Sequence, residues 1–184
     1  MFKVAVIVGS LRKESFNRKL ALALDNLKHP HLQFDILQLD EVPVFNQDNE
    51  KNLPAAVVNF KTAVSNADAV LFVTPEYNRS IPGVLKNIID WGTRPYGQNC
   101  WENKPTAIIG TSQSSVGTAI AQSHLRSIMT VLGGILLSQP EVYLVYKTDL
   151  IDEKQAITDE STKKFLLAFL ESFSNWIKKQ TEKK

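Results

Sequence analysis

The loop from Gly9 to Asn17 combines two hydroxyl groups, an arginine and an amide, and it directly follows an apolar run. Ser10 and Ser15 can donate hydroxyl hydrogen bonds, and the Arg12 guanidinium can form a charge-assisted fork to phosphate oxygens. A helix beginning after the loop would add free N–H groups and the positive end of its dipole. Capping of that helix by Ser15 or Asn17 is the alternative, but capping explains one of these residues rather than four. The loop therefore predicts a phosphate site.

Two common nucleotide-binding motifs are absent from this loop. It contains no Gly-x-Gly-x-x-Gly fingerprint and no Gly-Lys-Ser or Gly-Lys-Thr of a P-loop. The sequence therefore argues against a Rossmann dinucleotide site and against a P-loop at this position.

A second loop, from Thr74 to Gly83, could form a rigid wall for a flat ring, because it contains two prolines and a glycine. Tyr77 offers an aromatic surface, and Glu76 and Asn78 offer polar edges. A flat heteroaromatic ring needs an apolar contact on its face and hydrogen bonds around its rim. A plain turn before a helix is the alternative interpretation, since Pro and Asn are common in turns.

A third loop, from Gly110 to Gly117, consists almost entirely of small and polar residues. Its glycines permit close approach of the backbone to a ligand or to another segment. The loop could line the same pocket as the first two, or it could be a solvated turn.

The loops need elements that bring them together, and the apolar runs before them predict buried strands. We expect strands over 4–8, 34–39, 69–74, 106–109 and 135–137, the last with an optional continuation over 142–146, and helices over 18–27, 55–65, 82–91, 117–132 and 161–179. This alternation predicts one α/β domain over residues 1–184: a doubly wound, five-stranded parallel sheet in the order 2-1-3-4-5, with helices on both faces. Ligands of such sheets bind where strands 1 and 3 end.

The composition points to an ordinary globular protein. A net charge of +2 is too weak to argue for nucleic acid, and no apolar stretch reaches the length of a membrane span. Cys100 is the only cysteine, which excludes an intramolecular disulfide and favours a reducing, cytoplasmic compartment. Neither Cys100 nor the three histidines sit in a catalytic pattern, and the carboxylates show no metal-ligand spacing. We therefore expect no catalytic side chain and no metal.

In this order, the three loops resemble those of the NADPH-dependent FMN reductase family, the flavodoxin-like quinone, azo-dye and chromate reductases. The similarity rests on residues 9–17, on 74–78, and on 80–87 running into Asp90 and Trp91. It extends from the first strand to the helix before Pro140. The first two loops together are specific, because either one alone occurs in other contexts.

The resemblance implies a flavodoxin-like fold with non-covalent FMN and with NADPH or NADH as the electron donor. It implies that the phosphate and ribityl chain are held by Ser10, Arg12, Ser15, Phe16 and Asn17, that the ring is bordered by Pro75, Glu76, Tyr77 and Asn78, and that Thr111 and Ser112 complete the pocket. Electrons would pass to a small-molecule acceptor (a quinone, azo compound, flavin or metal oxyanion) in a ping-pong cycle whose chemistry belongs to the cofactor. The family is commonly dimeric or tetrameric, so a homodimer or homotetramer is expected.

Two other functions stay open at this point. A non-enzymatic flavin electron carrier would share the fold, but such carriers are usually acidic and this chain is slightly basic. An anion-binding α/β interaction domain would use the first loop alone. The chain also departs from the family where Thr118 and Ala119 follow Gly117 and where Arg79 occupies a variable position. Both lie near the expected open face of the flavin, so the acceptor stays open too.

Overall fold

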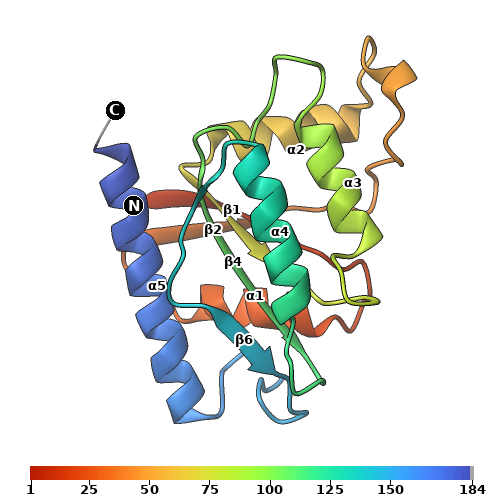
Figure 1. Cartoon of the computed structure of the whole chain (residues 1–184). Helices are drawn as coiled ribbons and strands as arrows, with labels where there is room; N and C mark the ends of the chain where they lie inside the picture. Colours follow the sequence, from red (N-terminus) through yellow and green to blue (C-terminus); the bar gives the residue numbers. More distant parts are fainter. Residues whose placement is uncertain (183–184) are drawn as a thin grey trace.

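In the computed structural model, which describes residues 1–182, a parallel sheet lies at the centre and α-helices cover it (Figure 1). The strands are β1 (Phe2–Val8), β2 (Leu32–Ile36), β3 (Ala69–Val73), β4 (Pro105–Ser112), β5 (Ile135–Leu136) and β6 (Val142–Val145). The helices are α1 (Phe16–Asn26), α2 (Ala55–Asn66), α3 (Gly83–Gly92), α4 (Ala119–Val131) and α5 (Glu160–Thr181), with a short 3₁₀ turn at Gln47–Asn49.

The strand order β2-β1-β3-β4-β5 is the one predicted from the sequence. β5 and β6 both pair with β4, β5 beside Pro105 and Thr106 and β6 beside Ile109 to Ser112. They therefore lie one after the other along the same edge, and the optional continuation of the fifth strand is confirmed. Pro140 lies in the gap between them, where its missing N–H breaks the ladder.

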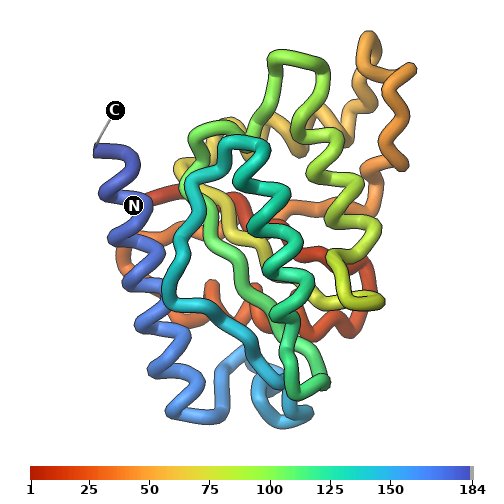
Figure 2. Tube along the Cα trace, viewed as in Figure 1, coloured from red at the N-terminus to blue at the C-terminus, as the bar shows by residue number. Residues whose placement is uncertain are grey.

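The two faces of the sheet carry separate hydrophobic clusters. Along β1 the side chains alternate: Val4, Val6 and Val8 pack with α1 and α5, whereas Ala5 and Ile7 pack with α2, α3 and α4. Figure 2 shows α5 on one side of the sheet and α3 on the other. Because both faces are covered, β1 and β3 read as continuous apolar runs, which is why their sequences predict strands.

Most predicted boundaries differ from the structure by one or two residues, and three of the differences affect the sheet or the site. β4 continues to Ser112, so Gly110, Thr111 and Ser112 belong to a strand and not to a loop, because β6 pairs with them. α1 begins at Phe16 rather than at residue 18. β2 lies at Leu32–Ile36 rather than at 34–39, because its partner β1 begins at Phe2 and sets the register.

The carboxyl ends of β1, β3 and β4 lie side by side. The N–H of Gly9 donates to the carbonyl of Val73 at 3.0 Å, and the N–H of Thr74 donates to the carbonyl of Ile109 at 2.9 Å. These two hydrogen bonds continue the ladder past the last paired residues. The three loops singled out in the sequence therefore start at the same edge of the sheet.

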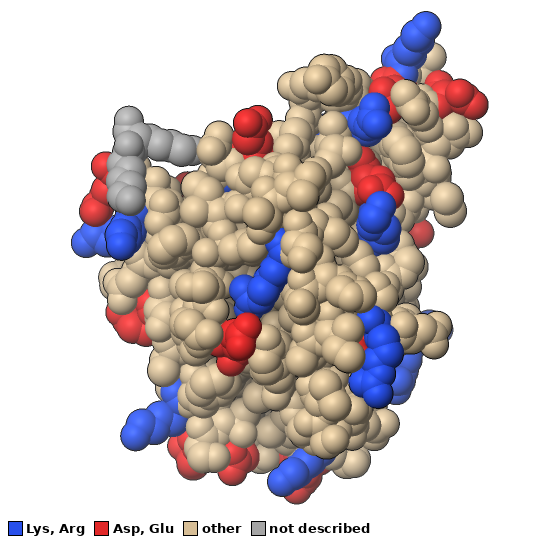
Figure 3. Space-filling model, viewed as in Figure 1, with Lys and Arg blue, Asp and Glu red and all other residues tan. Residues whose placement is uncertain are grey.

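Charged side chains of both signs are interspersed on the face shown in Figure 3, without a large area of one sign. This distribution agrees with the small net charge. Within residues 1–182, no helix combines the length and the apolar character needed to cross a bilayer.

Candidate functional site

The three loops enclose a pocket of about 160 Å³ at the carboxyl edge of the sheet. Its lining consists of Ser10, Arg12, Ser15, Phe16, Asn17, Pro75, Glu76, Tyr77, Thr111, Ser112 and Gln113. Ten of the eleven residues named from the sequence are in this lining. Asn78 is not, and its contact with a ring stays a prediction. Gln113, which follows Ser112 in the third loop, is a further lining residue beyond those predicted.

The N-terminus of α1 opens into this pocket. Ser15 is its N-cap: the Oγ accepts the N–H of Arg18 at 3.2 Å, and the side chain is buried. The N–H groups of Phe16 and Asn17, in the first turn, have no acceptor within the helix. The first turn contains no acidic residue that would occupy the positive end of the dipole. The capping role of Ser15 thus leaves two backbone donors for an anion.

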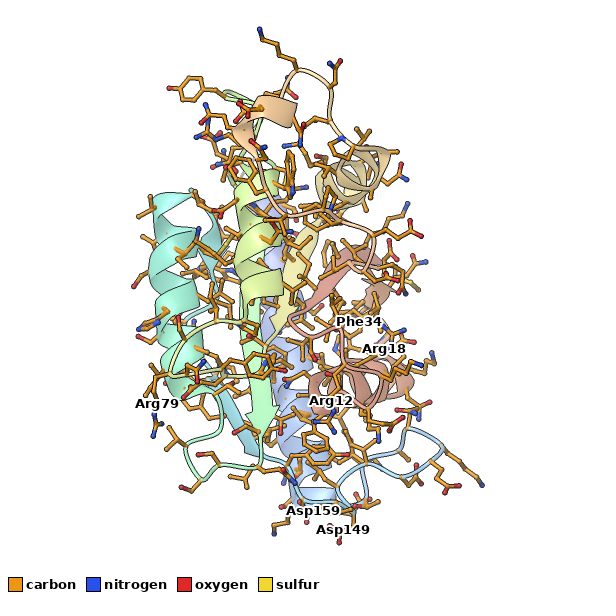
Figure 4. The ribbon with its side chains drawn as sticks, turned by 90° about the vertical axis from the view of Figure 1, so that its right-hand side faces the viewer. Arg12, Arg18, Phe34, Arg79, Asp149 and Asp159 are labelled. Atoms are coloured by element: carbon orange, nitrogen blue, oxygen red, sulfur yellow. The ribbon has the colours of Figure 1, made fainter. Side chains whose placement is uncertain are left out.

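Arg12 stands over an aromatic stack at one side of the pocket. Its guanidinium carbon lies 4.8 Å from the centre of the Phe16 ring, and Phe16 stacks on Tyr146 with 4.0 Å between ring centres. Among the described residues, no carboxylate lies within ion-pair distance of the Arg12 guanidinium. Figure 4 places Arg12 near the arrow tip of β4. The guanidinium is therefore held in place by the ring and has its donors free for an anion.

Asn17 joins the first loop to the third. Its Nδ2 donates to the carbonyl of Thr111 at 2.9 Å, and its Oδ1 accepts the N–H of Thr111 at 3.0 Å. Both residues are buried, and Thr111 Oγ1 donates to the carbonyl of Leu144. The Asn17 amide thus fixes α1 against the end of β4. The Asn17 side chain therefore has a positioning role. Both of its polar atoms bind Thr111, so Asn17 offers a ligand its backbone N–H.

Glu76 caps α4. Its Oε2 accepts the N–H groups of Ile120 and Ala121 at 3.0 and 3.1 Å, and its Oε1 lies 3.6 Å from Arg79 Nη1. A carboxylate at this place satisfies two donors of the first turn and the positive end of the helix dipole. The side chain therefore binds the second loop to the helix that follows the third loop.

A tight turn from Tyr77 to Ser80 forms the outer lip of the pocket. The N–H of each of these residues donates to the carbonyl of the other at 3.0 Å, and the two central residues, Asn78 and Arg79, have φ of 51° and 61°. Positive φ at both positions defines a type I′ turn. Within it, Tyr77 keeps half of its surface exposed and faces the pocket, while Asn78 lies outside the lining.

Two glycines are required by the close packing around the pocket. A Cβ at Gly110 would lie far inside contact distance of the Thr74 carbonyl and Thr118 Oγ1. Gly117 has a φ of +62°, and a Cβ there would approach the backbone of Tyr143. Its carbonyl accepts the Ser112 hydroxyl at 2.6 Å, which folds the third loop back on itself.

The remaining candidate side chains lie away from the pocket. Burial raises the pKa of the Cys100 thiol to about 11, so this thiol is not a nucleophile at neutral pH. His29 lies 3.1 Å from Glu171 and holds the pKa of that carboxyl below its usual range, and His124 contacts the Ser80 hydroxyl. The part of the chain that the structure describes contains no group of three or more side chains placed to hold a metal ion.

The residues around the pocket fit a phosphorylated flat ring such as FMN. The buried Pro75 and the exposed ring of Tyr77 provide apolar surface, while the turn before α1 provides hydroxyl, guanidinium and N–H donors. Apolar walls with a few convergent polar groups are the usual make-up of cofactor sites.

Comparison with known proteins places this geometry in a family. Residues 2–149 match the family model of the NADPH-dependent FMN reductases. A 2-hydroxy-1,4-benzoquinone reductase of Burkholderia sp. is 46% identical over 176 residues, covering 96% of each chain, and a quinone reductase of Pseudomonas putida is 42% identical over 97% of this chain and 96% of its own. FerB of Paracoccus denitrificans, a flavoenzyme NAD(P)H:(acceptor) oxidoreductase, superposes with a TM-score of 0.94 at 44% identity, covering 98% of this chain and 99% of its own. The chain belongs to the NADPH-dependent FMN reductase family.

Proposed function

We propose that this protein is an FMN-dependent NAD(P)H oxidoreductase that passes electrons to small-molecule acceptors, quinones among them. The observation that carries the proposal is the single pocket in which the free N-terminus of α1 meets the wall formed by Pro75 and Tyr77. The names of the relatives, quinone reductase and NAD(P)H:quinone oxidoreductase, support the same reaction class.

The first loop would hold the FMN phosphate. Ser10 and Ser15 bring hydroxyls, Arg12 brings a bidentate cation, and the N–H groups of Phe16 and Asn17 point along the helix axis toward the anion. The Phe16 ring contacts the Arg12 guanidinium and is itself stacked on Tyr146. Because Arg12 is already held in place, it loses little side-chain entropy when the anion binds.

The second and third loops would border the ring. Pro75 and Tyr77 lie on one side, and Ser112 and Gln113 offer polar groups on the other. FMN, when bound, supplies the redox chemistry, accepting hydride from a reduced nicotinamide and passing electrons to the acceptor. The pocket residues would act by binding and orienting the ring and the substrates. Donor and acceptor would use the same exposed opening in turn, which is a ping-pong cycle.

Two separate half-reactions are the direct test of this activity. We expect FMN-loaded protein to lose its visible flavin absorbance when mixed anaerobically with NADPH or NADH, and to regain it when 1,4-benzoquinone is added after the donor is removed. Stopped-flow absorbance measures both steps. The activity proposal is wrong if the loaded protein is not reduced by either nucleotide.

A non-enzymatic electron carrier is the second candidate, and one observation counts against it. Such carriers present strongly acidic surfaces to basic partners, whereas charges of both signs are mixed on the face shown in Figure 3 and the net charge is +2. Slow or absent reduction by the nucleotides, together with tight FMN binding, would favour the carrier.

We also propose that the protein works as a homodimer or homotetramer. Tyr96 and Val131 leave 90% and 86% of their surfaces exposed, and burying such side chains against a second copy of the chain would be favourable. Sedimentation analysis should therefore give a multiple of the 20.6 kDa chain mass, and a particle of that mass alone would contradict the proposal.

A further inference from the structure

A second pocket lies on the other side of the first loop, between the carboxyl ends of β1 and β2. It has a volume of about 190 Å³, and its lining contains three cationic side chains, Arg12, Lys13 and Arg18, and one carboxylate, Asp40. It shares Ser10 and Arg12 with the candidate FMN pocket, so the two pockets adjoin. Figure 4 shows Arg12 and Arg18 on the same side of the molecule, away from Arg79.

The cations of this pocket lack partners, although their neighbours have them. Lys19, one residue further along α1, pairs with Glu14 at 2.7 Å. Lys13 and Arg18, by contrast, have no ion pair or side-chain hydrogen bond among the described residues, and Arg18 is half-buried. Asp40 forms no ion pair with either of them. Like charges gathered at a concave surface raise the local potential and attract an anion.

Arg12 lines both pockets, so the three cations divide between two anions if Arg12 serves the FMN phosphate. The Arg12 guanidinium stands over the Phe16 ring, and Phe16 lines the FMN pocket and not the second one. The contact with Phe16 favours the FMN phosphate as the partner of Arg12. Lys13 and Arg18 remain for a second anion, with Asp40 beside them.

We propose that this second pocket binds the 2′-phosphate and ribose of the adenosine end of NADPH. In dinucleotide sites in general, an acidic residue binds a ribose hydroxyl or an arginine accommodates the 2′-phosphate. Here Asp40 follows β2, and Arg18 and Lys13 face the same pocket. The inference rests on the proposed function, since it assigns a subsite to the electron donor, and it predicts a preference for NADPH over NADH.

The test is nucleotide binding to FMN-saturated protein, measured by calorimetry without any turnover. We expect adenosine 2′,5′-bisphosphate to bind about tenfold more tightly than adenosine 5′-monophosphate, the scale of a charge-assisted hydrogen bond to a phosphate. Arg18→Ala should remove most of that difference and Lys13→Ala part of it. The Arg18 N–H that completes the α1 cap belongs to the backbone, so the cap survives the substitution. Lys28→Ala is the matched control, because Lys28 lies just beyond the far end of α1, paired with Asp25.

Three outcomes would overturn the inference. The two nucleotides could bind equally well, inorganic phosphate could compete as strongly as the bisphosphate, or Arg18→Ala could weaken FMN binding as much as bisphosphate binding, which would make the pocket part of the FMN site. Failure of the proposed function is distinguishable from all of these: in that case the protein would not bind FMN or would not be reduced by either nicotinamide donor.

Discussion

Replacing Arg12 with alanine is expected to weaken FMN binding about tenfold to a hundredfold. The guanidinium has no carboxylate partner in the described structure, and the Phe16 ring fixes it beside the N-terminus of α1. Its loss removes charge-assisted hydrogen bonding to the phosphate, and a net loss equal to one such bond, about 1.5–3 kcal/mol, corresponds to this range. The dissociation constant follows from quenching of flavin fluorescence during titration of the FMN-free protein at fixed ionic strength.

Two variants separate the geometry of Arg12 from its charge. Arg12→Lys keeps the positive charge but cannot form the planar fork, so its dissociation constant should fall between those of the wild type and Arg12→Ala. Lys28→Ala removes a positive charge beyond the other end of α1 and should leave FMN binding unchanged. An unchanged dissociation constant for Arg12→Ala would remove Arg12 from the phosphate site.

Gly110→Ala is expected to lower the free energy of unfolding by about 3 kcal/mol, at the upper end of what overpacking costs. The new methyl group would collide with the Thr74 carbonyl, which belongs to the backbone and cannot rotate away, and with Thr118 Oγ1. This close contact can be relieved only by separating the ends of β3 and β4. Such a movement would also displace Thr111, the next residue in the chain, whose N–H donates to Asn17. Chemical denaturation followed by circular dichroism measures the loss, and FMN affinity should fall with it.

Gly83→Ala is the matched control for this substitution. Gly83 is the first residue of α3, and no atom lies within 4 Å of where its Cβ would be. Alanine has the higher helix propensity, so this variant should be neutral or more stable by up to about 1 kcal/mol. If Gly110→Ala proved as stable as Gly83→Ala, the close contact between β3 and β4 would not exist in solution.

The fold could be predicted from local patterns because the sheet is buried on both faces. The run from Val4 to Val8 predicts a strand by itself, and alternation with amphipathic helices then leaves few topologies. The extension of β4 through Gly110 to Ser112 could not be predicted, since it depends on pairing with Tyr143 to Val145, some thirty residues later. The small and polar residues from Gly110 to Ser112 form a strand there because a partner strand pairs with them.

The site could be predicted because its residues come in contiguous loops after the strands. What those side chains bind within the protein could not be predicted. Glu76 caps a helix more than forty residues away, Asn17 binds the backbone of Thr111, and Tyr146 stacks on Phe16 although the two lie far apart in the sequence. These are long-range contacts with no local signal. They show that several residues of the family motif hold the loops together as well as lining the pocket.

FMN binding in this pocket is the property on which the proposed activity depends most directly. The decisive measurement is the visible spectrum of the purified protein, followed by titration of FMN-free protein with FMN. We predict a yellow protein, or one that takes up FMN stoichiometrically with a shifted flavin spectrum and quenched fluorescence. A colourless protein that gains no FMN on titration would contradict the account.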